Sequence, residues 1–208
     1  MTKYDKAVSV CFSGHRSVPF AKRRELKQCL KSEIAKAYAD GYRYFYCGMA
    51  MGFDLLAAEA ALSLQCELKD LQVIAVVPFR GQSDRWSKEE QAKYDAILRI
   101  VDDVVVLSEQ YYNGCLLRRN DYMVTRSSRL IAYFDGNPKG GTFYTVREAK
   151  RQGLDIGNHH NSVKPIKQKL HMDDIVAIIV CYFVFGALGN VLRALFGGER
   201  RNDFRRDR

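Results

Sequence analysis

The sequence lacks several features that would assign it to a familiar class of protein. It has six cysteines in 208 residues but no CxxC pair, and no cysteine or carboxylate cluster accompanies His159, His160 and His171 at ligand spacing. We therefore predict no metal site, reduced core cysteines and a linker histidine pair. The N-terminus has no long apolar region typical of a secretory signal, which favours a cytoplasmic domain. No glycine-rich segment ends in GK[ST], which excludes a Walker P-loop.

The charge is positive without being concentrated. The formal net charge is +9. Such an excess suits an anionic small ligand, a nucleic acid or an anionic membrane surface, and it is equally consistent with a basic surface that has no polyanion partner.

Short apolar runs alternate with helical patterns through the first 156 residues. The runs are rich in Val, Ile, Tyr and Phe, as in strands buried on both faces of a parallel sheet. Strand–helix alternation predicts an α/β fold with a doubly wound, mostly parallel sheet. The predicted strands are 7–12, 42–47, 71–79, 102–108 and 129–135, and the predicted helices are 20–40, 53–66, 87–100, 115–128 and 142–152.

The α/β pattern ends at about residue 156. Residues 157–174 are polar and are predicted to be a linker. Residues 175–192 contain no charged side chain and would span ~27 Å as a helix, which predicts a transmembrane or membrane-associated helix at 175–196. The alternative is a helix buried in a homo-oligomer. The basic tail, residues 197–208, is predicted to be disordered, and basic residues on both flanks leave the membrane orientation open.

The loops that follow the predicted strands share a composition. All five contain glycine at or near the turn, and three contain arginine or lysine. In a parallel sheet these loops meet at one edge, where ligands bind. Glycine turns, helix N-termini and cations together form phosphate-binding rims, although tight strand–helix turns also need glycine without any ligand. The loops are 13–17, 48–54, 80–86, 109–114 and 136–142.

Five segments in these regions resemble the YpsA-like branch of the SLOG superfamily, which includes the Lonely Guy phosphoribohydrolases and DNA-processing protein A. The segments are SGHR (13–16), YCGMAMGFD (46–54), VVPFRGQSDRW (76–86), LLRRNDYMV (116–124) and DGNPKGGTFYTVREA (135–149). The resemblance covers most of the first 150 residues and excludes the apolar C-terminal segment. It implies a Rossmann-like fold and a pocket for a nucleotide or nucleotide derivative.

The first two segments supply candidate ligand-binding residues. Gly14 permits a turn that places His15 and Arg16 within reach of a phosphate or base, and His15 is either a general acid–base group or a packed turn residue. Gly48 and Gly52 allow close approach of the backbone. Asp54 either caps the helix that it begins or accepts hydrogen bonds from ribose hydroxyls.

The next two segments add Arg80 and Trp86, then a pair of adjacent arginines. Trp86 is the single tryptophan and either stacks on a base or covers the sheet edge. Of the two arginines, matching to the family favours Arg119, with Asn120, as the residue that points into the pocket.

The last segment places Gly140, Gly141 and Thr142 at a predicted helix start, where N–H groups and a hydroxyl form a phosphate cradle. In the Lonely Guy family a glutamate follows the glycine–threonine pair within about three residues and acts in glycosidic bond cleavage. Here residues 143–145 are Phe, Tyr and Thr, and Glu148 lies almost two turns along the helix. This departure argues against N-glycosidase activity.

The sequence therefore predicts a nucleotide-binding module that acts as a sensor coupled to a membrane segment. Its ligand is nucleotide-derived, and no other cofactor is expected. The alternative is a nucleotide-processing enzyme of the phosphoribohydrolase type, with acid–base chemistry from Asp54, His15 or Glu148. Single-stranded DNA binding ranks third, and nucleic acid is predicted to be an unlikely partner, because basic residues are interleaved with Glu25, Glu89 and Glu90.

Overall fold

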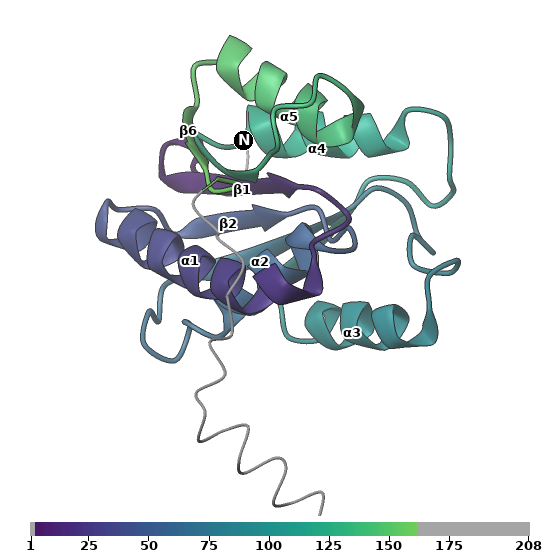
Figure 1. The fold of residues 1–208 in the computed structure, drawn as a ribbon, viewed down its shortest axis with the longest axis horizontal. Helices are drawn as coiled ribbons and strands as arrows, with labels where there is room; N and C mark the ends of the chain where they lie inside the picture. Colours follow the sequence, from purple (N-terminus) through teal and green to yellow (C-terminus); the bar gives the residue numbers. More distant parts are fainter. Residues whose placement is uncertain (1–2, 162–208) are drawn as a thin grey trace, which may run out of the picture. The chain divides into compact units, whose positions relative to one another are not determined.

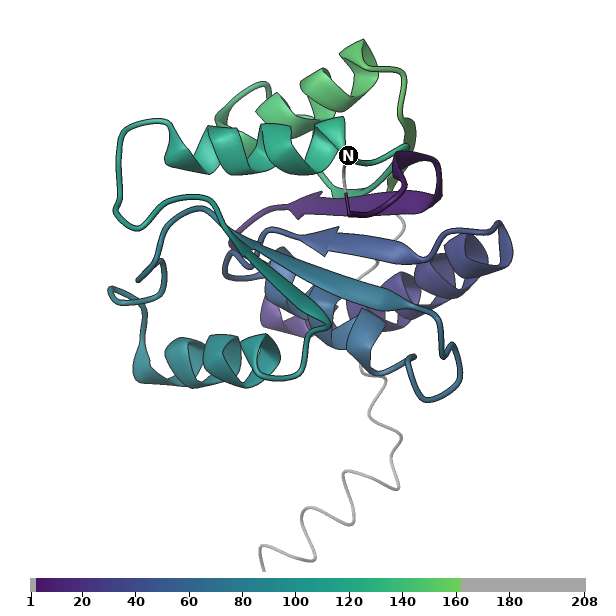
Figure 2. The same cartoon turned by 180° about the vertical axis from the view of Figure 1, so that it is seen from behind.

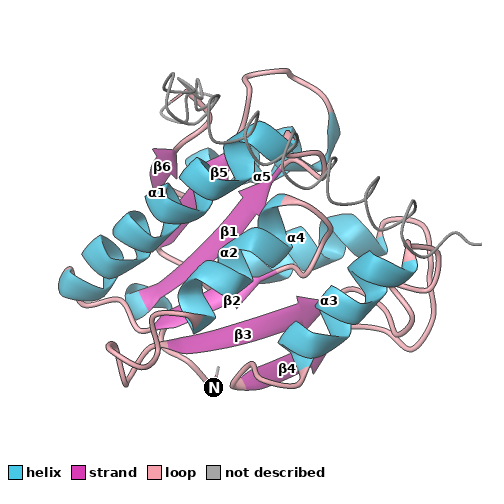
Figure 3. Ribbon diagram, turned by 60° about the horizontal axis from the view of Figure 1, so that its bottom comes forward, coloured by secondary structure: helices cyan, strands magenta, loops and turns pink. Residues whose placement is uncertain are grey.

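A computed structural model describes residues 3–161 of the chain (Figure 1). They form a sheet of six parallel strands in the order β4-β3-β2-β1-β5-β6. The strands are β1 (Ser9–Gly14), β2 (Tyr44–Cys47), β3 (Gln72–Val77), β4 (Asp103–Val106), β5 (Arg129–Tyr133) and β6 (Asp155–Asn158). The predicted parallel α/β architecture is confirmed, and Figure 3 shows the strand arrows running in one direction.

Helices cover both faces of the sheet. Helices α1 (Phe20–Ala39), α2 (Phe53–Leu62) and α3 (Lys88–Leu98) lie on one face, and α4 (Cys115–Thr125) and α5 (Gly140–Arg151) lie on the other (Figures 1 and 2). Within these layers α1 packs on α2, and α4 packs on α5. A short 3-10 helix, Lys6–Val8, precedes β1.

The two core layers follow from the alternation of side chains along each strand. Val10 and Phe12 of β1 pack with α1 and α2, whereas Cys11 packs with the α4 and α5 layer. Successive side chains of a strand point to opposite faces, so a continuously apolar strand supplies both cores. The buried cysteines are free thiols, and burial raises the pKa of Cys11 to about 12.

The chain reverses its direction across the sheet at β1. Strands β2, β3 and β4 follow one another on one side of β1, and β5 and β6 lie on the other side. Helices change face at the same point, so the loops after β1 and β5 separate beyond their carboxyl ends. In open α/β sheets this switch point is where a crevice forms.

The sheet continues past the predicted end of the domain at residue 156. Gly157 and Asn158 of β6 pair with β5, and the N–H of His159 donates to the carbonyl of Ala132 at 2.9 Å. His159 also packs on α1, where its Nδ1 lies 3.5 Å from Cys29 Sγ. His159 is thus part of the folded domain rather than of a solvated linker.

The remaining C-terminal predictions lie outside the described residues. These are most of the linker, the apolar segment at 175–196 and the basic tail at 197–208. Within residues 3–161, no helix combines the length and apolar character needed to cross a membrane. Membrane association is therefore a prediction without support from the described part of the chain.

Candidate functional site

A cleft of about 460 Å³ opens at the switch point of the sheet. It is bounded by the end of β1, the start of α2 and the N-terminal turns of α4 and α5. Small-molecule sites range over about 300–1,000 Å³, so this cleft has room for a ligand of nucleotide size. Nine of the residues predicted from sequence line it: Gly14, His15, Arg16, Asp54, Arg119, Asn120, Gly140, Gly141 and Thr142.

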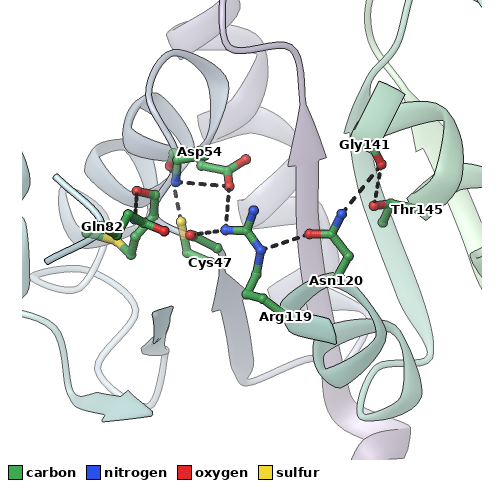
Figure 4. A network of polar contacts seen from close by, with 10 residues as sticks. Cys47, Asp54, Gln82, Arg119, Asn120, Gly141 and Thr145 are labelled. Carbon is green, nitrogen blue, oxygen red and sulfur yellow. Dashed lines mark hydrogen bonds and ion pairs between the residues drawn. The ribbon is translucent and has the colours of Figure 1, made fainter. Parts of the chain in front are cut away.

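A buried polar network forms the floor of the cleft (Figure 4). The guanidinium Nη1 of Arg119 lies 3.7 Å from Asp54 Oδ2 and also donates to the carbonyl of Gly48. The Nε–H of Arg119 donates to Asn120 Oδ1 at 2.8 Å, and Asn120 Nδ2 donates to the carbonyl of Gly141 at 3.5 Å. Helices α2, α4 and α5 are thus connected across the cleft by side chains.

Asp54 holds the turn that precedes its helix. Its Oδ2 accepts a hydrogen bond from the N–H of Ala50 at 3.2 Å, so the carboxylate supports the glycine turn rather than the N–H groups of its own helix. The other carboxylate oxygen, Oδ1, has no hydrogen-bond partner among residues 3–161. It is therefore a hydrogen-bond acceptor that these residues leave unused.

Burial sets the protonation of the pair. It raises the pKa of the Asp54 carboxyl to about 6, and the opposing effects of Arg119 and the Ala50 N–H do not cancel it. Burial also lowers the pKa of Arg119, although an arginine stays charged at physiological pH. The pair is only 7% exposed at each side chain. The pair is thus a buried part of the cleft floor with one titratable carboxyl, that of Asp54.

Three of the predicted glycines are required by packing against protein atoms. A Cβ on Gly14 would lie 2.3 Å from the Phe53 ring, and one on Gly48 would lie 2.2 Å from Arg119 Nη1. Gly52 has φ of +78°, and its Cβ would lie 2.1 Å from the carbonyl oxygen of Arg16. Gly48 and Gly52 do not line the cleft, and they shape the turn that holds Asp54.

The glycines at the start of α5 differ from these three. A Cβ on Gly140 would meet no atom within 4 Å, and one on Gly141 would meet only Asn120 Nδ2, at 3.7 Å. Both residues face open cleft rather than packed protein. Their N–H groups, with that of Thr142, belong to the first turn of a helix and lack intrahelical partners.

Helices α4 and α5 begin at the cleft without side-chain caps, as α1 does away from it. Neither α4 nor α5 has a side-chain cap or an acidic residue in its first turn. Helix α3, which contributes no residue to the cleft, is capped by Ser87 and carries Glu89 and Glu90 in its first turn. Side-chain caps and acidic residues normally satisfy and stabilise a helix N-terminus. The first N–H of α4, that of Cys115, donates to the carbonyl of Tyr112 at 3.1 Å, but no side chain caps either of these helix N-termini.

His15 is a member of the turn that closes the cleft. Its Nε2 accepts the N–H of Asp135 at 3.1 Å, and the ring lies beside Tyr133 and Phe134. This geometry matches the packed turn histidine more closely than a free general acid or base. Arg16, the next residue, is exposed and lines the cleft as a cation.

Arg80 and Trp86 lie away from the cleft. Arg80 pairs with Glu109 at 2.7 Å on the surface. Trp86 packs edge-on against Tyr94, with ring centroids 5.3 Å apart, at the margin of the α1–α3 core. Neither residue is in the cleft wall. Trp86 therefore packs against this core and does not face the cleft.

Several wall residues were not predicted from sequence. The most prominent are Tyr111 and Asn113 in the loop between β4 and α4, and Lys139 before α5. Lys139 is adjacent to the predicted glycine pair, and that position was a usable signal. Tyr111 lies in the predicted edge loop 109–114, but its sequence neighbourhood does not distinguish it from the adjacent Tyr112, which is outside the cleft.

Comparisons with known proteins agree with the resemblance found in the sequence. The model of the YspA SLOG family matches residues 10–168. A UPF0398 protein from Bacillus licheniformis is 28% identical over 128 residues, which cover 61% of this chain and 70% of that protein. A UPF0398 protein from Bacillus thuringiensis is 27% identical over 138 residues, which cover 65% of this chain and 74% of that protein.

A solved structure shares the fold. DNA processing protein A from Helicobacter pylori, which binds single-stranded DNA, matches with a TM-score of 0.53 and 19% identity over 73% of this chain. This chain spans 64% of that structure, and the likeness concerns the fold alone. The prediction that nucleic acid is an unlikely partner finds no support here, since a protein of this fold binds DNA.

Proposed function

Because the chain belongs to the YspA SLOG family, we propose that its cleft binds a nucleotide or nucleotide derivative. The observation that carries the proposal is the pair of uncapped helix N-termini, of α4 and α5, at one cleft. Each presents N–H groups and the positive end of a helix dipole, which together favour a phosphate. The glycines at the start of α5 leave space for an anion to approach these N–H groups.

The charges of the wall support the same ligand. Arg16 and Lys139 form no ion pair with any of residues 3–161, whereas Asp54 is the single carboxylate among the described residues that line the cleft. Asp54 is already paired with Arg119, so the excess charge that faces the ligand is positive. A phosphate near α5 and a ribose hydroxyl at Asp54 Oδ1 would satisfy both polar features of the cleft.

Binding is favoured over glycosidic cleavage by the placement of carboxylates. Glycoside hydrolysis generally uses two carboxyl groups that flank the scissile bond. Asp54 lines the cleft, but Glu148 lies outside it, where it binds Arg151 and Gln152 on the far side of α5. A single cleft carboxylate supports recognition of a hydroxyl better than a hydrolytic pair.

The test is calorimetric titration of the full chain with AMP, ADP, ADP-ribose and NAD, and with adenosine as the matched ligand without phosphate. We expect saturable binding of at least one phosphorylated ligand and at least tenfold weaker binding of adenosine. At a hundredfold excess over Kd, such a ligand should stabilise the fold by about 2.7 kcal/mol. A single-stranded oligonucleotide belongs in the same panel. Binding of the oligonucleotide alone would replace a small nucleotide with DNA as the ligand.

A finer version of the proposal, a sensor coupled to a membrane segment, rests on the sequence of residues 175–196. Flotation with vesicles of neutral and anionic lipid tests it, with a chain that ends at residue 161 as the control. The full chain should float with the vesicles and the shortened chain should not. Equal flotation of both chains, or of neither, would contradict the membrane prediction.

A further inference from the structure

The loop between β4 and α4, with the first turn of α4, gives the cleft an apolar wall beside its polar floor. Tyr111, Leu116 and Leu117 line this wall. Tyr111 is 64% exposed and Leu117 is 41% exposed, which is high for large apolar side chains. Exposed aromatic and aliphatic groups that converge on a cleft are typical of a place where a ligand covers them.

The Tyr111 ring is held in position from the neighbouring loop after β3. The ring of Phe79 meets it edge-on, with centroids 5.3 Å apart and planes at 80°. The N–H of Arg80 donates to the carbonyl of Ser108 at 3.0 Å, and the Arg80 side chain pairs with Glu109. These contacts connect the two loops directly before Tyr111. In a T-shaped pair at most one face of the Tyr111 ring is covered, so the other face remains available for stacking.

We infer that Tyr111 is the stacking platform for the nucleobase of the bound ligand, an inference that rests on the proposed nucleotide function. The phosphate would lie at the N-terminus of α5, and the base would lie on the tyrosine at the β4–α4 loop. Both positions belong to one cleft. Trp86 cannot serve as this platform because it packs against Tyr94 outside the cleft wall.

Stacking predicts the chemical class of the ligand. A tyrosine face attracts any base, and the larger purine ring system covers more of it than a pyrimidine does. The adjacent Asn113 offers an amide donor and acceptor at the same wall. The site is therefore assigned to purine nucleoside phosphates, with ribose phosphates that lack a base as weaker ligands.

Titration of the full chain with AMP and with ribose 5-phosphate separates the base from the phosphate. Wild type should bind AMP more tightly. Tyr111→Ala should weaken AMP binding by about 5- to 150-fold, the range of base–aromatic stacking, and should leave ribose 5-phosphate within about twofold of wild type. Tyr111→Phe retains the ring and should bind AMP within about threefold of wild type.

Tyr112→Ala is the matched control. Tyr112 is the adjacent tyrosine, 38% exposed, and is not a cleft residue. The Tyr112→Ala protein should bind AMP as wild type does. AMP affinity that is unchanged in Tyr111→Ala, or equal affinity of wild type for AMP and ribose 5-phosphate, would overturn the stacking inference and leave phosphate binding intact. Failure of wild type to bind AMP would overturn the stacking inference, and failure to bind ADP, ADP-ribose and NAD as well would overturn the proposed function.

Discussion

The substitution Gly141→Ala separates a structural glycine from a ligand-binding one. Gly141 is the second residue of α5, and an added Cβ would contact only Asn120 Nδ2, at an ordinary van der Waals distance of 3.7 Å. The fold should therefore accept alanine without displacement. The methyl group would nevertheless enter the cleft, because Cα–Cβ bonds in a helix tilt toward its N-terminus.

The two expected effects have opposite signs. Replacing a glycine by alanine at a compatible helical position stabilises the ligand-free protein by about 0.4–1 kcal/mol, or roughly 1–4 °C in Tm for a domain of this size. Ligand binding should weaken because a phosphate oxygen can no longer reach the N–H of residue 141. Loss of one hydrogen bond to a charged group costs about 1.5–3 kcal/mol, or roughly 10- to 150-fold in Kd.

Thermal unfolding without ligand and calorimetry with AMP measure the two effects. Lys150→Ala, at the exposed far end of α5, is the control and should leave the Kd of AMP unchanged. A stabilised Gly141→Ala protein that binds AMP as wild type does would refute a phosphate site at this helix. A Gly141→Ala protein with a lowered Tm would refute the packing argument itself.

Three other predictions concern the buried pair, the tryptophan and the last strand. Because burial raises the pKa of Asp54 to about 6, the stability of wild type relative to Asp54→Asn should fall by roughly 1–3 kcal/mol between pH 4 and pH 7, as the folded carboxyl loses its proton. Denaturant unfolding of both proteins across this pH range measures the difference in stability. A difference that is constant or rises with pH would show that the pKa is not raised. Trp86→Phe should lower Tm through lost packing and leave the Kd of AMP within twofold, whereas tenfold weaker binding at an unchanged Tm would place Trp86 in the site. A chain that ends at residue 156 should be less stable than one that ends at residue 161 by about 1.5 kcal/mol or more. The shorter chain loses both hydrogen bonds between Asn158 and Phe134 and the hydrogen bond from the His159 N–H to β5. Equal denaturant midpoints for the two chains would contradict the role of β6.

Apolar runs predicted the first five strands because four of them, β1, β2, β3 and β5, are almost wholly buried, and because the partly exposed edge strand β4 is still the apolar run DVVV. The run RLIAY of β5 is buried at every residue, which is why it reads as a strand without alternation. Strand β6 was missed for the opposite reason. It is an edge strand of four residues, DIGN, with exposed ends, and its pairing depends on β5 rather than on its own composition. Short polar edge strands have no periodic signal that a sequence can show.

The candidate site was predictable where the topology alone brings residues together. The loops after β1, β2 and β5 meet because parallel strands end at one edge, and their glycines and cations could be read directly. The role of each glycine could not be predicted from the sequence, because only the fold shows that Gly48 packs on Arg119 whereas Gly141 faces the open cleft.

Two aromatic residues illustrate the same limit. Trp86 is rare and lies in a polar loop, yet it packs on Tyr94. Tyr111 lies in the cleft because Phe79, from another loop, supports it. Such placement is decided by contacts between loops that are distant in sequence, and local residue patterns do not report it.

The most direct measurement is a crystal structure of the full chain with AMP bound at saturating concentration. Nucleotide binding at the switch point predicts a phosphate within hydrogen-bond distance of the N–H groups of Gly141 and Thr142, and a ribose hydroxyl near Asp54. A phosphate bound elsewhere on the protein, or an empty cleft at a concentration that saturates the calorimetric signal, would contradict it.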